Sequence, residues 1–144
     1  MSTVFLWISS DQSDPSSVSI TDFRVNLTNR IENPVSCDLV QFRVNYSQAM
    51  NEPLFISSRA LGNTTISGAP NGSGLQRWWR AIPYMPDALA TNQTVNAFYN
   101  PRLEYTPVKQ EFLKDIDIQI TDINAQPYAG IDSVAILVAV KVRE

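Results

Sequence analysis

Apolar and polar residues alternate with a period of two along several stretches of the chain. Near the end, Ile116, Ile118 and Ile120 alternate with polar residues, and residues 134–140 then run on without a polar side chain. Residues 23–28 and 40–46 show the same alternation nearer the start. A period of two is typical of a β-strand with one buried face, and a short continuous apolar run suits a strand that is covered on both faces. The pattern therefore predicts that the chain ends in two core strands.

The remaining strands are bounded by clusters of Gly, Pro, Asn, Asp and Ser, which favour turns. No stretch of a dozen residues has the period of a helix. The predicted strands cover residues 3–9, 19–28, 37–46, 53–58, 75–82, 93–99, 112–121 and 133–143. We therefore expect an all-β fold, an eight-stranded antiparallel β-sandwich, and a single jelly roll is the eight-stranded form built from two sheets.

The length of 144 residues fits one domain. Residues 1–17 are predicted to be an N-terminal arm or an edge strand. Phe5 and Trp7 belong to an apolar run there, which a Ser-, Asp- and Pro-rich segment separates from the rest of the chain. Residues 18–144 are predicted to form the jelly-roll domain.

The composition argues against several classes of function. The chain has no histidine, which removes the commonest general base and metal ligand. Its single cysteine, Cys37, cannot form an intrachain disulfide and is expected to be a buried thiol. The net charge is −3 and the basic residues are scattered, so direct binding of nucleic acid is not expected. We expect no enzyme activity, no cofactor and no metal, and the short apolar runs predict neither a signal peptide nor a membrane span.

Asp115 and Asp117 lie two residues apart on one predicted strand and therefore share a face. Such a pair could serve as catalytic carboxylates or as part of a calcium site. The preferred interpretation is an alternating, solvated strand face. The chain has neither an EF-hand loop nor a glycine-rich phosphate-binding loop.

The segment Arg77-Trp78-Trp79-Arg80 combines aromatic and cationic side chains. Neighbouring strand residues point to opposite faces, so two interpretations stay open. Either the two rings are a buried pair split between the faces, or one ring is exposed and anchors a partner, as Trp and Arg do at interface hot spots.

The closing apolar strand also has apolar residues on its second face, namely Ala135, Leu137 and Ala139. Such a strand is either central under additional cover or packed against another subunit. Together with Phe5, Trp7 and the segment 77–80, these three residues are the predicted partner contacts.

The order of several motifs resembles a known family. Ser9-Ser10-Asp11-Gln12-Ser13-Asp14 is followed by Asp22-Phe23-Arg24-Val25-Asn26-Leu27, by Cys37-Asp38-Leu39-Val40-Gln41-Phe42, and later by residues 112–122 and the closing valine strand. This order is similar to that of the single jelly-roll vertex (penton) and minor capsid proteins of icosahedral double-stranded DNA viruses whose major capsid protein is a double jelly roll. The resemblance implies a jelly roll standing upright at a fivefold vertex of the virion, with five copies contacting the surrounding major capsid proteins. It also implies a purely structural protein, made in the host cell without a signal peptide.

Two other classes of function are weighed against this one. A carbohydrate- or ligand-binding β-sandwich module would use Trp78 or Trp79 as a stacking platform. A glycosidase-like or isomerase jelly roll is disfavoured, because the chain has no histidine and no compelling acid/base pair.

Overall fold

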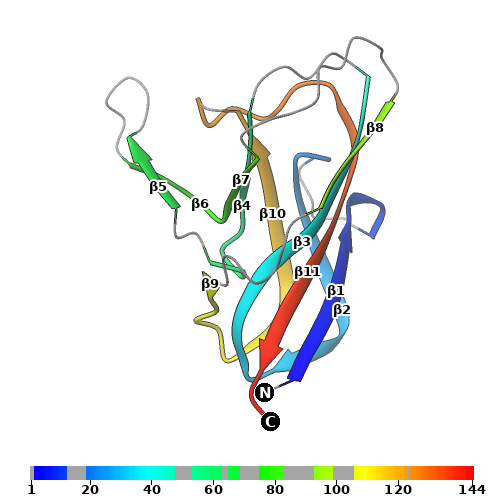
Figure 1. The fold of residues 1–144 in the computed structure, drawn as a ribbon. Helices are drawn as coiled ribbons and strands as arrows, with labels where there is room; N and C mark the ends of the chain where they lie inside the picture. Colours follow the sequence, from blue (N-terminus) through cyan, green and yellow to red (C-terminus); the bar gives the residue numbers. More distant parts are fainter. Residues whose placement is uncertain are drawn as a thin grey trace.

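A computed structural model of the chain describes residues 2–12, 19–47, 53–62, 65–68, 75–82, 93–98, 106–122 and 124–144 (Figure 1). The fold is all-β, as predicted. The helical structure within the described residues is one turn of 3₁₀ helix, η1 (Ser10–Gln12).

The strands form two large antiparallel sheets and one hairpin. The first sheet has the order β1 (Ser2–Ser9), β11 (Ile131–Val142), β3 (Pro34–Tyr46) and β8 (Gln93–Phe98), and β9 (Thr106–Pro107) also pairs with β3. The second has the order β2 (Asp22–Glu32), β10 (Phe112–Thr121), β4 (Leu54–Ser57) and β7 (Arg80–Ile82). The hairpin of β5 (Thr65–Gly68) and β6 (Leu75–Trp78) projects away from both sheets (Figure 1).

The predicted count of eight strands is wrong for the described residues, which hold eleven. One predicted strand, 75–82, is broken by a bend at Trp79, so that β6 belongs to the hairpin and β7 to the second sheet. The two additional strands, β5 and β9, are short and lie in stretches rich in Thr, Gly and Pro, where the alternation of apolar residues is weak.

Strand pairing in the two large sheets is nested. The first strand, β1, pairs with the last, β11, and β2 pairs with β10. Further in, β3 pairs with β8 and β4 with β7. Each of these pairs lies in the opposite sheet from the pair before it. The chain therefore forms one long antiparallel hairpin whose strand pairs alternate between the two sheets.

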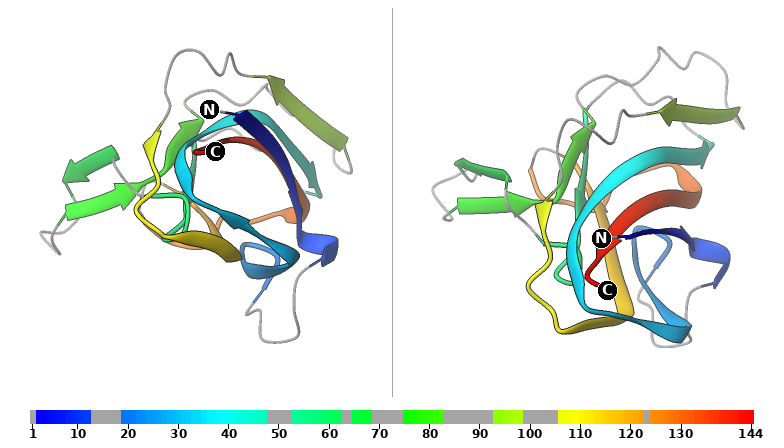
Figure 2. Two further views of the ribbon diagram at one scale, coloured as in Figure 1. Left: turned by 90° about the horizontal axis from the view of Figure 1, so that it is seen from below. Right: turned by 60° about the horizontal axis from the view of Figure 1, so that its bottom comes forward.

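The core lies between these two sheets, which face each other when the molecule is seen along its length (Figure 2). Alternation decides which residues enter it: Ile116, Ile118 and Ile120 of β10 are fully buried, and so are Ile136 and Val138 of β11. The two-sheet sandwich is therefore the arrangement that buries the apolar face of every long strand. The structure confirms that β11 is central in its sheet, between β1 and β3.

Strand β1 is the edge strand of the first sheet. It pairs with β11 from Ser2 to Ser9, and Leu6 and Ile8 join the core. Of the two predictions for residues 1–17, the structure shows the edge strand for residues 2–9, while residues 1 and 13–17 lie outside the described part. The thiol of Cys37 is buried as predicted and donates to the carbonyl oxygen of Leu61 at 3.3 Å.

Candidate interaction surface

Five predicted contact residues lie together on the outer face of the first sheet. Phe5 is the register partner of Ala139, and Trp7 is the register partner of Leu137. Ala135 lies two residues before Leu137 on β11 and is the register partner of Ser9. Directly paired residues of antiparallel strands share a face, so these side chains form one surface, which we call the outer stripe. It comprises Phe5, Trp7, Ala135, Leu137 and Ala139.

Exposure along the outer stripe is uneven. Phe5 is 63% exposed and Trp7 is 42% exposed, which is unusual for large apolar side chains in one neighbourhood. Ala135 and Leu137 are half-buried. Ala139 is 1% exposed, so the prediction that it contacts a partner is wrong: it lies opposite Asp38 of β3, which is itself buried.

A hollow of about 250 Å³ opens at the end of the outer stripe beside Trp7. Its lining is mostly polar and comes from β1, η1, β3 and β11: Trp7, Ser9, Asp11, Arg43, Asn45, Ser133, Val134 and Ala135. Of this set, Trp7 and Ala135 are the residues that the sequence predicts as partner contacts. Apart from Val134, the others are polar residues, and strand register places them around one tryptophan.

Both tryptophans of the segment 77–80, Trp78 and Trp79, are buried. Trp79 is fully buried in the core, and its backbone N–H donates to the carbonyl oxygen of Ile56 at 2.8 Å. Trp78 is 5% exposed and its ring stacks on Phe55, with 4.0 Å between the ring centroids. The interpretation of a buried pair is thus confirmed, and the exposed anchor or sugar platform at Trp78 or Trp79 is wrong.

Arg80 is also buried, which contradicts its prediction as a partner contact. It lies opposite Ile56 in the β4–β7 pair, so its side chain starts from the core face of the second sheet. Its guanidinium forms an ion pair with Asp38, with Nε donating to Oδ1 at 3.1 Å, and Nη1 donates to the carbonyl oxygen of Trp79 at 2.7 Å. This ion pair ties β7 of one sheet to β3 of the other. Arg77 pairs with Ile66 through the backbone, and its side chain lies outside the described part.

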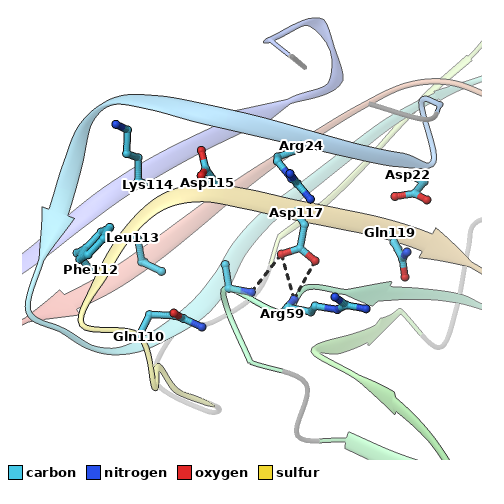
Figure 3. Close-up of a pocket in the computed structure, with 11 residues that line it drawn as sticks. Asp22, Arg24, Arg59, Gln110, Phe112, Leu113, Lys114, Asp115, Asp117 and Gln119 are labelled. Atoms are coloured by element: carbon cyan, nitrogen blue, oxygen red, sulfur yellow. Dashed lines mark hydrogen bonds between the residues drawn. The ribbon is translucent and has the colours of Figure 1, made fainter. Parts of the chain in front are cut away.

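A larger hollow of about 800 Å³ lies on the outer face of the second sheet (Figure 3). Asp115 and Asp117 both line it, on the shared face that was predicted. The carboxylate of Asp117 accepts hydrogen bonds from the backbone N–H groups of Arg59 and Ala60, at 3.1 Å each. Asp115 makes no such contact with the described residues and is exposed. Asp117 therefore holds the turn that follows β4.

Within the described residues, no group of three or more acidic, histidine or cysteine side chains is arranged to hold a metal ion. No helix in that part of the chain is long and apolar enough to cross a membrane.

A comparison with models of known protein families found no match to this chain, and a comparison with curated proteins found none either.

Proposed function

We propose that this chain is a single jelly-roll capsid subunit that forms a homopentamer at the vertex of an icosahedral virion and contacts the major capsid protein. The nested strand pairing carries the proposal. A jelly roll is a long hairpin rolled into two sheets, and the nesting of the four pairs β1–β11, β2–β10, β3–β8 and β4–β7 supports this proposal. The role is structural, with no catalytic step.

The outer stripe supports this proposal because it gives the sandwich a surface suited to a neighbouring subunit. Large apolar side chains exposed side by side on a sheet face mark interaction sites more often than isolated ones do. Strand β1 adds a free sheet edge along the same surface, because it pairs only with β11 among the described strands. Natural proteins usually cover or block such edges.

Phe5 is the centre of the proposed contact. If a phenylalanine side chain has about 200 Å² of surface, its 63% exposure leaves about 125 Å² in water. Burying that area at about 25 cal/mol per Å² favours association by about 3 kcal/mol. This corresponds to a change of about 100-fold in the association constant of each contact.

The test compares Phe5→Ser with Phe112→Ser by sedimentation equilibrium over a range of protein concentrations. Phe112 is a matched control, since it is 41% exposed and lines the hollow on the other sheet. We expect Phe5→Ser to weaken self-association by about 100-fold and Phe112→Ser to leave it unchanged. Equal effects of the two substitutions, or no effect of Phe5→Ser on an oligomer that does form, would place the contact elsewhere.

A further inference from the structure

We infer that the hollow beside Trp7 binds one neutral sugar ring, such as the terminal hexose of a glycan. The inference goes beyond the proposed capsid role and does not depend on it. It concerns the Ala135 end of the outer stripe, beyond Trp7, where the lining changes from apolar to polar.

The strand register builds the hollow around a small residue. Ser9 of β1, Ala135 of β11 and Arg43 of β3 form one row across the sheet. Trp7 belongs to the next row along β1, and Ser133 with Asn45 forms the row on the opposite side. Because Ala135 has only a methyl group, the larger side chains around it stand as walls above a shallow floor.

The walls are held in place by hydrogen bonds. The Oγ of Ser10, in η1, accepts from the backbone N–H of Val134 at 3.1 Å, which ties η1 to β11. The backbone N–H of Asp11 donates to the Oγ of Ser9 at 3.2 Å. Across the hollow, the Nδ2 of Asn45 donates to the Oγ of Ser133 at 2.6 Å, and the hydroxyl hydrogen of Ser133 can still be donated.

The polar groups match hydroxyls better than they match an ion. Asp11 offers only acceptors, Arg43 offers only donors, and Ser133 can act as either. A sugar hydroxyl is both donor and acceptor, so it can use all three, whereas an anion needs donors and a cation needs acceptors. The carboxylate of Asp11 and the guanidinium of Arg43 also cancel in charge, and within the described residues neither is engaged in an ion pair.

Trp7 supplies the apolar half of the site. Trp7 is 42% exposed and lines the hollow, and an aromatic face can stack on the C–H face of a sugar. The volume of about 250 Å³ lies just below the usual range of small-molecule pockets, roughly 300–1,000 Å³. That size suits one ring and not an oligosaccharide.

The test is ligand-observed saturation-transfer NMR on the full chain, with the methyl glycosides of glucose, galactose and mannose as probes and methyl glucuronide as the charged control. We expect at least one neutral glycoside to bind. Trp7→Ala is expected to weaken its binding by about tenfold or more. Ala135→Val should also weaken the binding of the glycoside, because the larger side chain fills the floor of the hollow. Strands favour valine, and Trp7 stays in place in this variant. Phe5→Ser should bind the glycoside like the wild-type protein.

The proposed site is wrong if none of the three neutral glycosides binds, if methyl glucuronide binds better than all of them, or if neither Trp7→Ala nor Ala135→Val weakens binding. Sedimentation equilibrium of the same variants separates this site from the subunit contact. A Trp7→Ala variant that loses self-association but keeps sugar binding would assign Trp7 to the contact and overturn the sugar site. The sugar binding that we expect does not require the oligomer to form.

Discussion

Removing one partner of the buried Arg80–Asp38 ion pair should destabilise the sandwich strongly. The two side chains are 9% and 4% exposed. At the 3.1 Å that joins Nε to Oδ1, their gross attraction is about 5 kcal/mol for an effective dielectric constant of about 20. In Arg80→Met, the carboxylate of Asp38 stays buried without its counter-charge. We expect a loss of about 3–5 kcal/mol in the free energy of unfolding, the usual cost of breaking a buried pair.

The double variant Arg80→Met/Asp38→Asn is the matched control. It removes both charges, and the amide oxygen of the new asparagine can still accept from the backbone N–H of Leu39, as Oδ1 of Asp38 does at 2.8 Å. Because no buried charge is left unpaired, the double variant should recover at least half of the stability that Arg80→Met loses.

The assay is urea unfolding of the wild type, both single variants and the double variant, followed by circular dichroism. A loss of about 3–5 kcal/mol should also lower the melting temperature by about 6–20 °C in a domain of this size. Single variants that each cost less than about 1 kcal/mol and whose effects simply add would refute the reasoning. In that case the charged groups of Arg80 and Asp38 would be hydrated in the folded protein, and neither would depend on the other.

Three further predictions can be checked by the same unfolding measurement. Trp79→Ala should cost about 3–5 kcal/mol, and Trp78→Ala a similar amount, because both rings are buried; normal stability of either variant would contradict this. Gly62→Ala should cost about 1–3 kcal/mol, because φ is +99° there and a Cβ would lie 3.0 Å from the carbonyl oxygen of Pro107. Asp117→Ala should cost about 1–3 kcal/mol by leaving backbone N–H groups unpaired, whereas Asp115→Ala should change stability by less than about 0.5 kcal/mol.

The strands could be predicted from sequence because burial on one face imposes alternation. All eight predicted ranges contain strand residues, and the alternating isoleucines of 116–120 point into the core as expected. The prediction works best where a strand is long and regular. It is weaker where the register shifts, as between Gln41 and Leu39 opposite β11, where Val40 is only half-buried although the alternation places it inside.

The candidate site was harder to predict because contacts between distant segments decide exposure. Alternation alone could not tell which of Trp78 and Trp79 points outward, and in the structure Phe55 of another strand covers Trp78. Arg80 resembles an exposed cation in the sequence, and its ion pair with Asp38, 42 residues away, could not be read from the local pattern. Phe5 and Trp7, which the sequence predicts as partner contacts, are exposed because they lie on the outer face of the first sheet.

Native mass spectrometry of the purified chain tests the central claim most directly. One chain has a mass of 16.1 kDa, so a pentamer has five times that mass, about 80 kDa. The account predicts this species at high protein concentration, with dissociation to single chains on dilution. A chain that stays monomeric at all concentrations, including in the presence of capsid particles, or that forms only dimers, would contradict the account.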